Sequence, residues 1–154
     1  MRAELATAGL APAAPVRYGN WSQQWGIEAM TALLDSGNPD AASVLLDRLV
    51  EVEPDNAAVL EALARAHFDA RRYLAASAAF RRLVEANPAD DYAHYGLGMS
   101  LWRLQRFPDS RDHLAMATVM RPDKPDYAQA LKQVSATLRS REEAGLPLEG
   151  PISA

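Results

Sequence analysis

The chain has 154 residues, a formal net charge of −4 and a hydrophobic fraction of 49%. Length and composition of this kind are typical of one soluble globular domain rather than of a disordered chain. An acidic chain is a poor electrostatic partner for nucleic acid, so we expect no nucleic-acid binding. The sequence has no cysteine, which excludes disulfides, thiolate nucleophiles and thiolate metal sites.

The sequence also gives no sign of a membrane association. No stretch approaches the roughly 18 consecutive apolar residues of a membrane span. The first residues contain Arg2 and then Glu4, without an unbroken apolar segment after them, which disfavours a secretory signal. We therefore expect a cytoplasmic protein with no membrane partner.

The first predicted element is an N-terminal arm over residues 1–20, in which Pro12 and Pro15 interrupt an alanine-rich sequence. Proline restricts both its own backbone and the residue before it, and chain ends are commonly mobile. We expect the arm to be flexible. The alternative is that its apolar residues fold back into a partner-binding groove of the following domain, which spans residues 21–143, and shield that groove.

Three repeats make up most of that domain, at about residues 23–56, 57–90 and 91–124. Each repeat closes with a proline, and these prolines are 34 residues apart: Pro54, Pro88 and Pro122. Because proline cannot continue a helix, each one ends an amphipathic run and begins a turn. Each repeat is therefore predicted to hold two helices joined by a short turn.

Columns of residues recur in phase with these prolines. One column holds small residues, Ala42, Ala76 and Ser110. The column four residues later holds large ones, Leu46, Phe80 and Leu114. Offsets of three and four lie on one face of a helix, so the small column allows close helix contact and the large columns fill the core. No hairpin can bury its apolar face alone, and stacking predicts one continuous core.

This spacing resembles that of the tetratricopeptide repeat family, over about residues 21–122. The three spaced prolines match the family's closing proline, Ala42 and Ala76 match its small position, and Gly98 matches the glycine of its first helix. The family's first-helix tryptophan position departs from the pattern, with Gly26, Leu60 and His94. The resemblance implies an all-α fold, a right-handed α-solenoid of three antiparallel helix pairs with a terminal capping helix.

The last predicted helix covers residues 125–143. Its apolar stripe consists of Tyr127, Leu131, Val134 and Leu138. No second helix follows it, so we expect it to cap the stack and to turn a polar side to water. Residues 144–154 contain glycine and proline at short intervals and are predicted to form a flexible tail.

No combination of residues in the sequence suggests catalysis. His67 falls in a buried column, where we expect a hydrogen-bonded imidazole between helices. His94 and His113 do not have the spacing of metal ligands. The sequence holds no phosphate-binding loop, dinucleotide glycine cluster or nucleophile elbow. We therefore expect a protein that is not an enzyme and that holds no metal and no cofactor.

In the family that the chain resembles, the first helix of every pair forms the inner, concave wall. The candidate partner-binding residues implied for this wall are Ile27, Leu34, Glu61, Arg65, Phe68, Tyr92, Tyr95, Met99, Trp102 and Arg103. On the helix of the third repeat, a second apolar stripe, here called the aromatic stripe, consists of Tyr92, Tyr95, Met99 and Trp102. A helix that is apolar on two sides must be covered on both. Either the capping helix covers this stripe, or the stripe lines a groove for a partner.

We expect a protein- or peptide-binding module, an adaptor or chaperone-like subunit that grips an apolar or aromatic-anchored segment of another protein. Family members that clamp a C-terminal carboxylate use Lys, Asn and Arg at fixed wall positions. Those positions include Glu61, Tyr92 and Met99 here, which disfavours such a clamp. The alternative is a self-assembling structural subunit whose aromatic stripe forms a homodimer interface.

Overall fold

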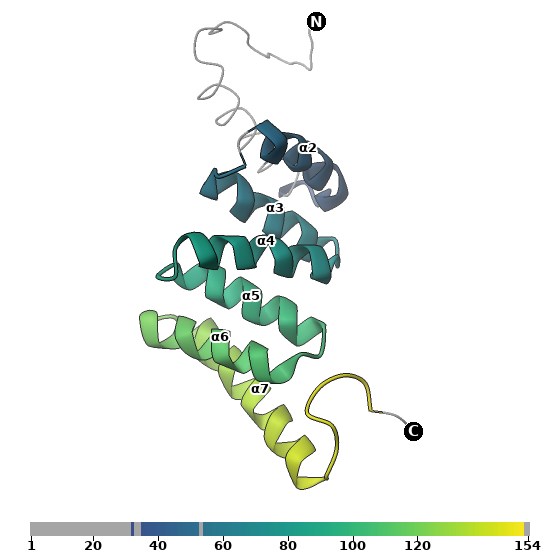
Figure 1. Cartoon of the computed structure of the whole chain (residues 1–154), viewed down its shortest axis with the longest axis vertical. Helices are drawn as coiled ribbons and strands as arrows, with labels where there is room; N and C mark the ends of the chain where they lie inside the picture. Colours follow the sequence, from purple (N-terminus) through teal and green to yellow (C-terminus); the bar gives the residue numbers. More distant parts are fainter. Residues whose placement is uncertain (1–31, 33–34, 53, 153–154) are drawn as a thin grey trace, which may run out of the picture.

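The structure is a computed structural model that describes residues 32, 35–52 and 54–152. Its helices are α2 (Pro39–Val52), α3 (Ala57–Asp69), α4 (Tyr73–Ala86), α5 (Asp91–Arg103), α6 (Phe107–Met120) and α7 (Pro125–Glu143). Each helix packs antiparallel against the next, in one stack from α2 to α7 (Figure 1). No strand occurs in the described part of the chain. The predicted all-α helical repeat fold is confirmed.

The helix boundaries follow the 34-residue spacing closely. The breaks predicted from the prolines are present between α2 and α3, α4 and α5, and α6 and α7. The sequence predicts a further break near residues 105–107, and this break lies one residue earlier, because Phe107 is already the first residue of α6. The first predicted helix and the N-terminal arm fall almost entirely outside the described residues, so those predictions stay open.

Side-chain oxygens at equivalent positions cap the N-termini of α3 and α5, which are the first helices of the second and third repeats. The Asn56 side chain accepts a hydrogen bond from the Val59 backbone N–H at 3.1 Å. Asp90, 34 residues later, accepts one from the Ala93 N–H at 3.0 Å. Such caps satisfy donors that the helix itself leaves unpaired. Lys124 holds the third equivalent position and cannot accept, and α7 begins instead with Pro125 at its first residue.

The small column allows paired helices to approach closely, as the sequence predicts. Ala42, Ala76 and Ser110 are all 0% exposed. In the last pair, a Cβ on Gly98 would lie 2.6 Å from Cγ of Leu114, which is too close for two carbon atoms. The Ser110 hydroxyl donates to the Gly98 carbonyl oxygen at 2.7 Å. Glycine at position 98 is therefore required for the contact between α5 and α6.

The turns within the pairs share a left-handed residue. Gly37, Arg71 and Gln105 are 34 residues apart and have φ values of 80°, 64° and 61°. In the second turn the Arg71 N–H bonds to the Phe68 carbonyl and the Arg72 N–H to that of His67. A pair of hydrogen bonds of this kind ends a helix through one residue in the left-handed conformation, which is usually glycine. Two of the three turns therefore carry a side chain where glycine is favoured.

Gln105→Gly and Arg71→Gly are each expected to raise the free energy of unfolding by about 0.5–1 kcal/mol. A side chain costs about 1–2 kcal/mol in the left-handed region, and the freer unfolded glycine offsets part of that gain. Gly37→Ala is the matched control and should lower stability by about 1 kcal/mol. Urea unfolding of the three variants measures these values, and a destabilised Gln105→Gly would contradict the account.

The capping helix covers the end of the stack. Tyr127, Val134 and Leu138 of α7 are buried, and the last two pack with Phe107 and Leu114 of α6. This is the apolar stripe that the sequence assigns to the helix. The long polar side of α7 faces away from α6, as a terminal helix requires. No helix in the described part of the chain is long and apolar enough to cross a membrane.

The segment after α7 folds back onto the last pair. The guanidinium of Arg141 donates to the carbonyl oxygens of Pro147 at 3.0 Å and Gly150 at 2.7 Å. It also lies 4.7 Å from the centre of the Phe107 ring, and the Gly150 N–H donates to the Gln105 carbonyl oxygen at 3.0 Å. The flexibility of the tail stays a prediction, and these contacts argue against it up to Gly150.

Candidate partner-binding groove

A hollow of about 170 Å³ opens on one side of the stack, between α3 and α5. It is lined by Arg65, Phe68, Asp69, Phe80, Tyr92, Tyr95, Gly96 and Met99. Three of these residues come from α3 and four from α5, and α4 supplies only Phe80. The hollow is thus built mainly by the first helices of the second and third repeats.

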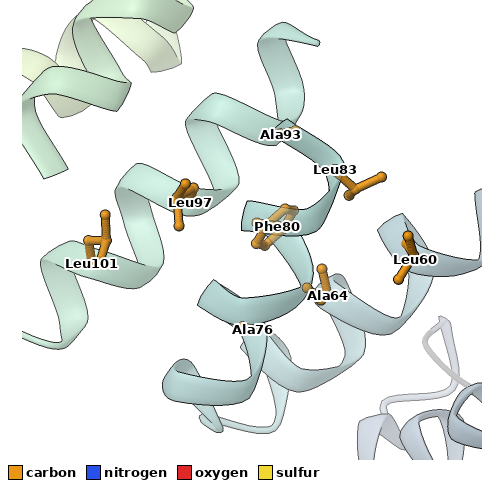
Figure 2. Close-up of a cluster of buried hydrophobic side chains, with 9 residues drawn as sticks. Leu60, Ala64, Ala76, Phe80, Leu83, Ala93, Leu97 and Leu101 are labelled. Carbon is orange, nitrogen blue, oxygen red and sulfur yellow. The ribbon is translucent and has the colours of Figure 1, made fainter. Parts of the chain in front are cut away.

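The floor of the hollow is formed by Phe80 against Gly96. Phe80 is 2% exposed and belongs to the buried cluster between α3, α4 and α5 (Figure 2). A Cβ on Gly96 would lie 2.3 Å from the Phe80 ring, so this ring needs glycine at position 96. Because Gly96 has no side chain, the Phe80 ring packs directly against α5 there, between the positions of Tyr92 and Met99.

Aromatic rings form the walls. The ring of Tyr92 meets Phe80 edge-on, with 6.1 Å between centres. The ring of Tyr95 stacks on Tyr127 of α7 at 4.6 Å. Burial is the main cause that raises the pKa of both Tyr92 and Tyr95. Their hydroxyls are therefore protonated at neutral pH and can donate hydrogen bonds to a ligand. Phe68 completes the wall on α3 and meets Tyr73 edge-on at 5.1 Å.

The structure brings half of the predicted site residues together. The five that line the hollow are Arg65, Phe68, Tyr92, Tyr95 and Met99. Ile27 and Leu34 lie outside the described residues. The other three do not line it, and their partner-binding role, like that of all ten, stays a prediction.

Those three residues lie around the hollow. The indole of Trp102 meets the Phe107 ring edge-on, with 5.3 Å between ring centres, and Trp102 packs against the cluster between α6 and α7. The guanidinium of Arg103 lies over the rings of Phe68 at 5.9 Å and Tyr73 at 5.4 Å. Glu61 is half-buried, and burial followed by the charge of Asp90 raises its pKa.

The capping helix covers the aromatic stripe only in part, and the role of the stripe in holding a partner stays a prediction. Tyr95, Met99 and Trp102 pack partly against the cluster to which α7 contributes, so the capping helix covers one flank of the stripe. Tyr92, Tyr95 and Met99 also line the open hollow. The stripe is therefore split along its length, covered near Trp102 and open toward Tyr92.

In the sequence, Phe80 falls in a column of large core residues, and nothing in that column indicates that it also forms the floor of a hollow. A signal for the hollow is present in the sequence, because Gly96 follows Tyr92 by four residues and precedes Met99 by three. A glycine within an apolar helical stripe removes one side chain from that face. The expected gap lies where the structure has the hollow.

The histidines are arranged differently from one another. The Arg72 side chain donates to Nδ1 of His67 at 3.2 Å. The imidazole is therefore hydrogen-bonded as predicted, but its partner lies in the turn before α4 rather than on a neighbouring helix. The sequence gives no relation between His94 and His113, yet their Nδ1 atoms lie 3.1 Å apart. Nε2 of His94 also lies 2.8 Å from the Pro88 carbonyl oxygen. Because that oxygen only accepts, Nε2 carries the hydrogen and the neutral Nδ1 of His94 accepts from His113.

This pair predicts acid-sensitive stability. Burial, then the proximity of His94 and Arg81, lowers the pKa of His113 below its value of about 6.5 in the unfolded chain. The unfolded chain then binds more protons below about pH 6.5, so the free energy of unfolding falls as the pH drops. His113→Leu, which copies Leu45 of the first repeat, should flatten this dependence between about pH 7 and pH 5. An unchanged slope in urea unfolding would contradict it.

No group of three or more histidine or carboxylate side chains in the described ranges is arranged to hold a metal ion. The hollow itself holds aromatic, thioether and charged side chains but no histidine. An apolar floor with aromatic walls and charged residues at its mouth suits the recognition of a side chain.

Comparison with known families supports the repeat assignment. Two family models, each described as a tetratricopeptide repeat, match residues 26–66 and 61–125. Together they cover residues 26–125, about two thirds of the chain. The overlap of the two matches falls in α3, the helix that provides one wall of the hollow. No curated protein matches the sequence.

Solved structures show the same fold. The first repeat domain of Spaghetti (RPAP3), bound to the HSP90 peptide SRMEEVD, aligns with a TM-score of 0.74 at 17% identity over 77% of this chain and 94% of that one. MamA from AMB-1 aligns with a TM-score of 0.67 at 26% identity over 77% of this chain and 65% of its own. The O-GlcNAc transferase of Thermobaculum terrenum aligns at 0.69 and 23% identity over 75% of this chain, which spans only 22% of the transferase.

Proposed function

Because the chain belongs to the tetratricopeptide repeat family, whose domains are generally non-catalytic modules for protein interaction, we propose that it binds a partner segment in the hollow between α3 and α5. The segment inserts one apolar or aromatic side chain over Phe80. Tyr92, Tyr95 and Met99 contact that side chain laterally. The protein is then an adaptor or chaperone-like subunit rather than an enzyme.

The observation that carries this proposal is the hollow itself. Its volume is about 170 Å³, whereas an apolar cavity of about 150 Å³ holds a benzene ring. The space therefore suits one ring or one branched aliphatic side chain. Tyrosine and methionine are enriched at protein interfaces, where they combine apolar area with adaptable or polar ends. The tyrosine hydroxyls can fix the ligand backbone by hydrogen bonds.

The similarity to the peptide-bound repeat domain does not extend the same ligand to this chain. A peptide such as SRMEEVD brings several carboxylates, and the groove already holds Asp69 in its lining and the half-buried Glu61 beside it. Bringing like charges together costs affinity. We expect SRMEEVD to bind at least tenfold more weakly than an apolar-anchored peptide, since about 1.4 kcal/mol corresponds to tenfold.

Selection from a random peptide library tests the proposal. Peptides selected on the full chain should share an apolar or aromatic anchor. Met99→Gln keeps the length of the side chain but makes the wall polar, so it should weaken the selected peptides by about tenfold or more. Met116→Gln is the matched control, because Met116 is 46% exposed on α6, outside the hollow.

Two results would contradict the proposal. One is a set of selected peptides without an apolar anchor. The other is a Met116→Gln variant that loses binding while Met99→Gln keeps it. Light scattering on the unliganded chain addresses self-assembly, because a stable dimer that Met99→Gln separates into monomers would support the homodimer function instead.

A further inference from the structure

Carboxylates lie on two sides of the hollow. Asp69 is exposed and lines it. Glu61 and Asp126 lie close enough for their charges to raise the pKa of Tyr92 and Tyr95, respectively. Arg65 is the single cationic residue among the lining residues. The apolar floor is therefore bordered by negative charge on both α3 and α7.

These carboxylates have little charge compensation. In residues 35–52 and 54–152, neither Glu61, Asp69 nor Asp126 takes part in a salt bridge. Arg65 lowers the pKa of Glu61 only as the smallest of three causes, after burial and the charge of Asp90. Glu61 is thus a half-buried carboxylate that a nearby cation would stabilise.

Two neighbouring cations, Arg103 and Lys124, are directed to aromatic rings, whereas Arg65 lines the hollow beside Asp69. The Arg103 guanidinium lies over Phe68 and Tyr73 and donates to the Tyr73 hydroxyl at 3.2 Å. The Lys124 ammonium lies 5.6 Å from the centre of the Tyr127 ring. Cations over ring faces are held there by the ring's electron density. They leave the carboxylates at the mouth available to a ligand.

We infer that the bound segment carries a lysine or arginine directly beside its apolar anchor. This inference rests on the proposed function, because it describes the occupant of the same hollow. When the anchor lies over Phe80, its neighbours in the peptide lie at the mouth, near Asp69 and Glu61. Opposite charges there speed encounter and select against acidic segments.

A set of synthetic peptides with one host sequence tests the inference on the full chain. Each peptide has Phe or Ala at the anchor position and Lys, Gln or Glu beside it. Fluorescence anisotropy should rank the Phe peptides Lys, then Gln, then Glu, with steps of about three- to fivefold, as for exposed ion pairs. Raising the salt should shrink the steps, because exposed charges are screened.

A carboxylate variant locates the effect. Asp69→Asn should reduce the preference for Lys over Gln by about threefold. Asp112→Asn is the matched control, because it removes an exposed carboxylate from α6, outside the hollow. This control should keep the full preference. A preference that Asp112→Asn reduces and Asp69→Asn retains would overturn the placement of the basic residue at the mouth.

The outcomes separate this inference from the proposed function. Equal dissociation constants for the Lys, Gln and Glu peptides, with Phe still preferred over Ala, would overturn the basic neighbour and leave the apolar anchor standing. Phe peptides that bind no better than Ala peptides would overturn the proposed function as well. If the Glu peptide bound most tightly, the partner would have an acidic residue beside its anchor, and the inference would be overturned.

Discussion

Phe80→Ala is expected to lower the free energy of unfolding by about 3–5 kcal/mol, because it leaves a cavity where a large ring was packed. The ring is 2% exposed and lies against Gly96, whose missing side chain it replaces. A domain of this size is stable by only about 5–15 kcal/mol. The loss would therefore be a large share of the total and should be plain in thermal or urea unfolding.

Two controls make the Phe80 result specific. Phe80→Leu introduces the residue that the same column has at Leu46 and Leu114, and we expect it to lower the free energy of unfolding by less than about 1.5 kcal/mol. Arg82→Ala removes an exposed side chain two residues later, whose guanidinium bonds the Pro54 carbonyl oxygen, and should change stability by at most about 0.5 kcal/mol. If Arg82→Ala were the most damaging of the three, the repeat frame would be wrong.

Tyr95→Ala is expected to weaken binding of an apolar-anchored peptide by about 2 kcal/mol or more, the loss typical of an interface hot spot. Tyr95 lines the hollow, and its hydroxyl can donate a hydrogen bond to a ligand. Isothermal titration calorimetry with a selected peptide measures the change. Because Tyr95 also stacks on Tyr127, the variant should lose some stability at the same time.

The control for Tyr95→Ala removes the other ring of the stacked pair, that of Tyr127. Tyr127→Leu abolishes the ring contact and the hydrogen bond from the Tyr127 hydroxyl to Asp91, but Tyr127 does not line the hollow. It should lower the unfolding temperature while the peptide affinity stays within about twofold, or 0.4 kcal/mol. Equal losses of affinity in both variants would show that Tyr95 acts through stability rather than by contact.

The fold is predictable from the sequence because the same structural unit occurs repeatedly. Each boundary is indicated by a proline and by columns of small and large residues at one spacing. Ala42, Ala76 and Ser110 are all completely buried, as one column in three equivalent helices should be. The left-handed turns follow the same spacing. Only the first of the three has a glycine, Gly37, which indicates such a turn in the sequence.

Features that occur only once were harder to predict. The positions equivalent to His94 hold Gly26 and Leu60 in the other repeats, so no column indicates a histidine contact. The pairing of His94 with His113 depends on how α5 and α6 cross. Trp102 lies on the predicted stripe, but its side chain is covered by Phe107, at the start of the next helix. Helical periodicity gives the face of a residue, not the neighbour that reaches it.

Methyl NMR on methionine-labelled protein tests the central claim most directly. The chain has five methionines, of which Met99 lines the hollow and Met116 and Met120 lie on α6, outside it. When an apolar-anchored peptide is added, the account predicts that the Met99 methyl signal shifts and saturates with binding, while the signals of Met116 and Met120 stay in place. Shifts at Met116 or Met120 with an unmoved Met99 would place the partner on another face and contradict the account.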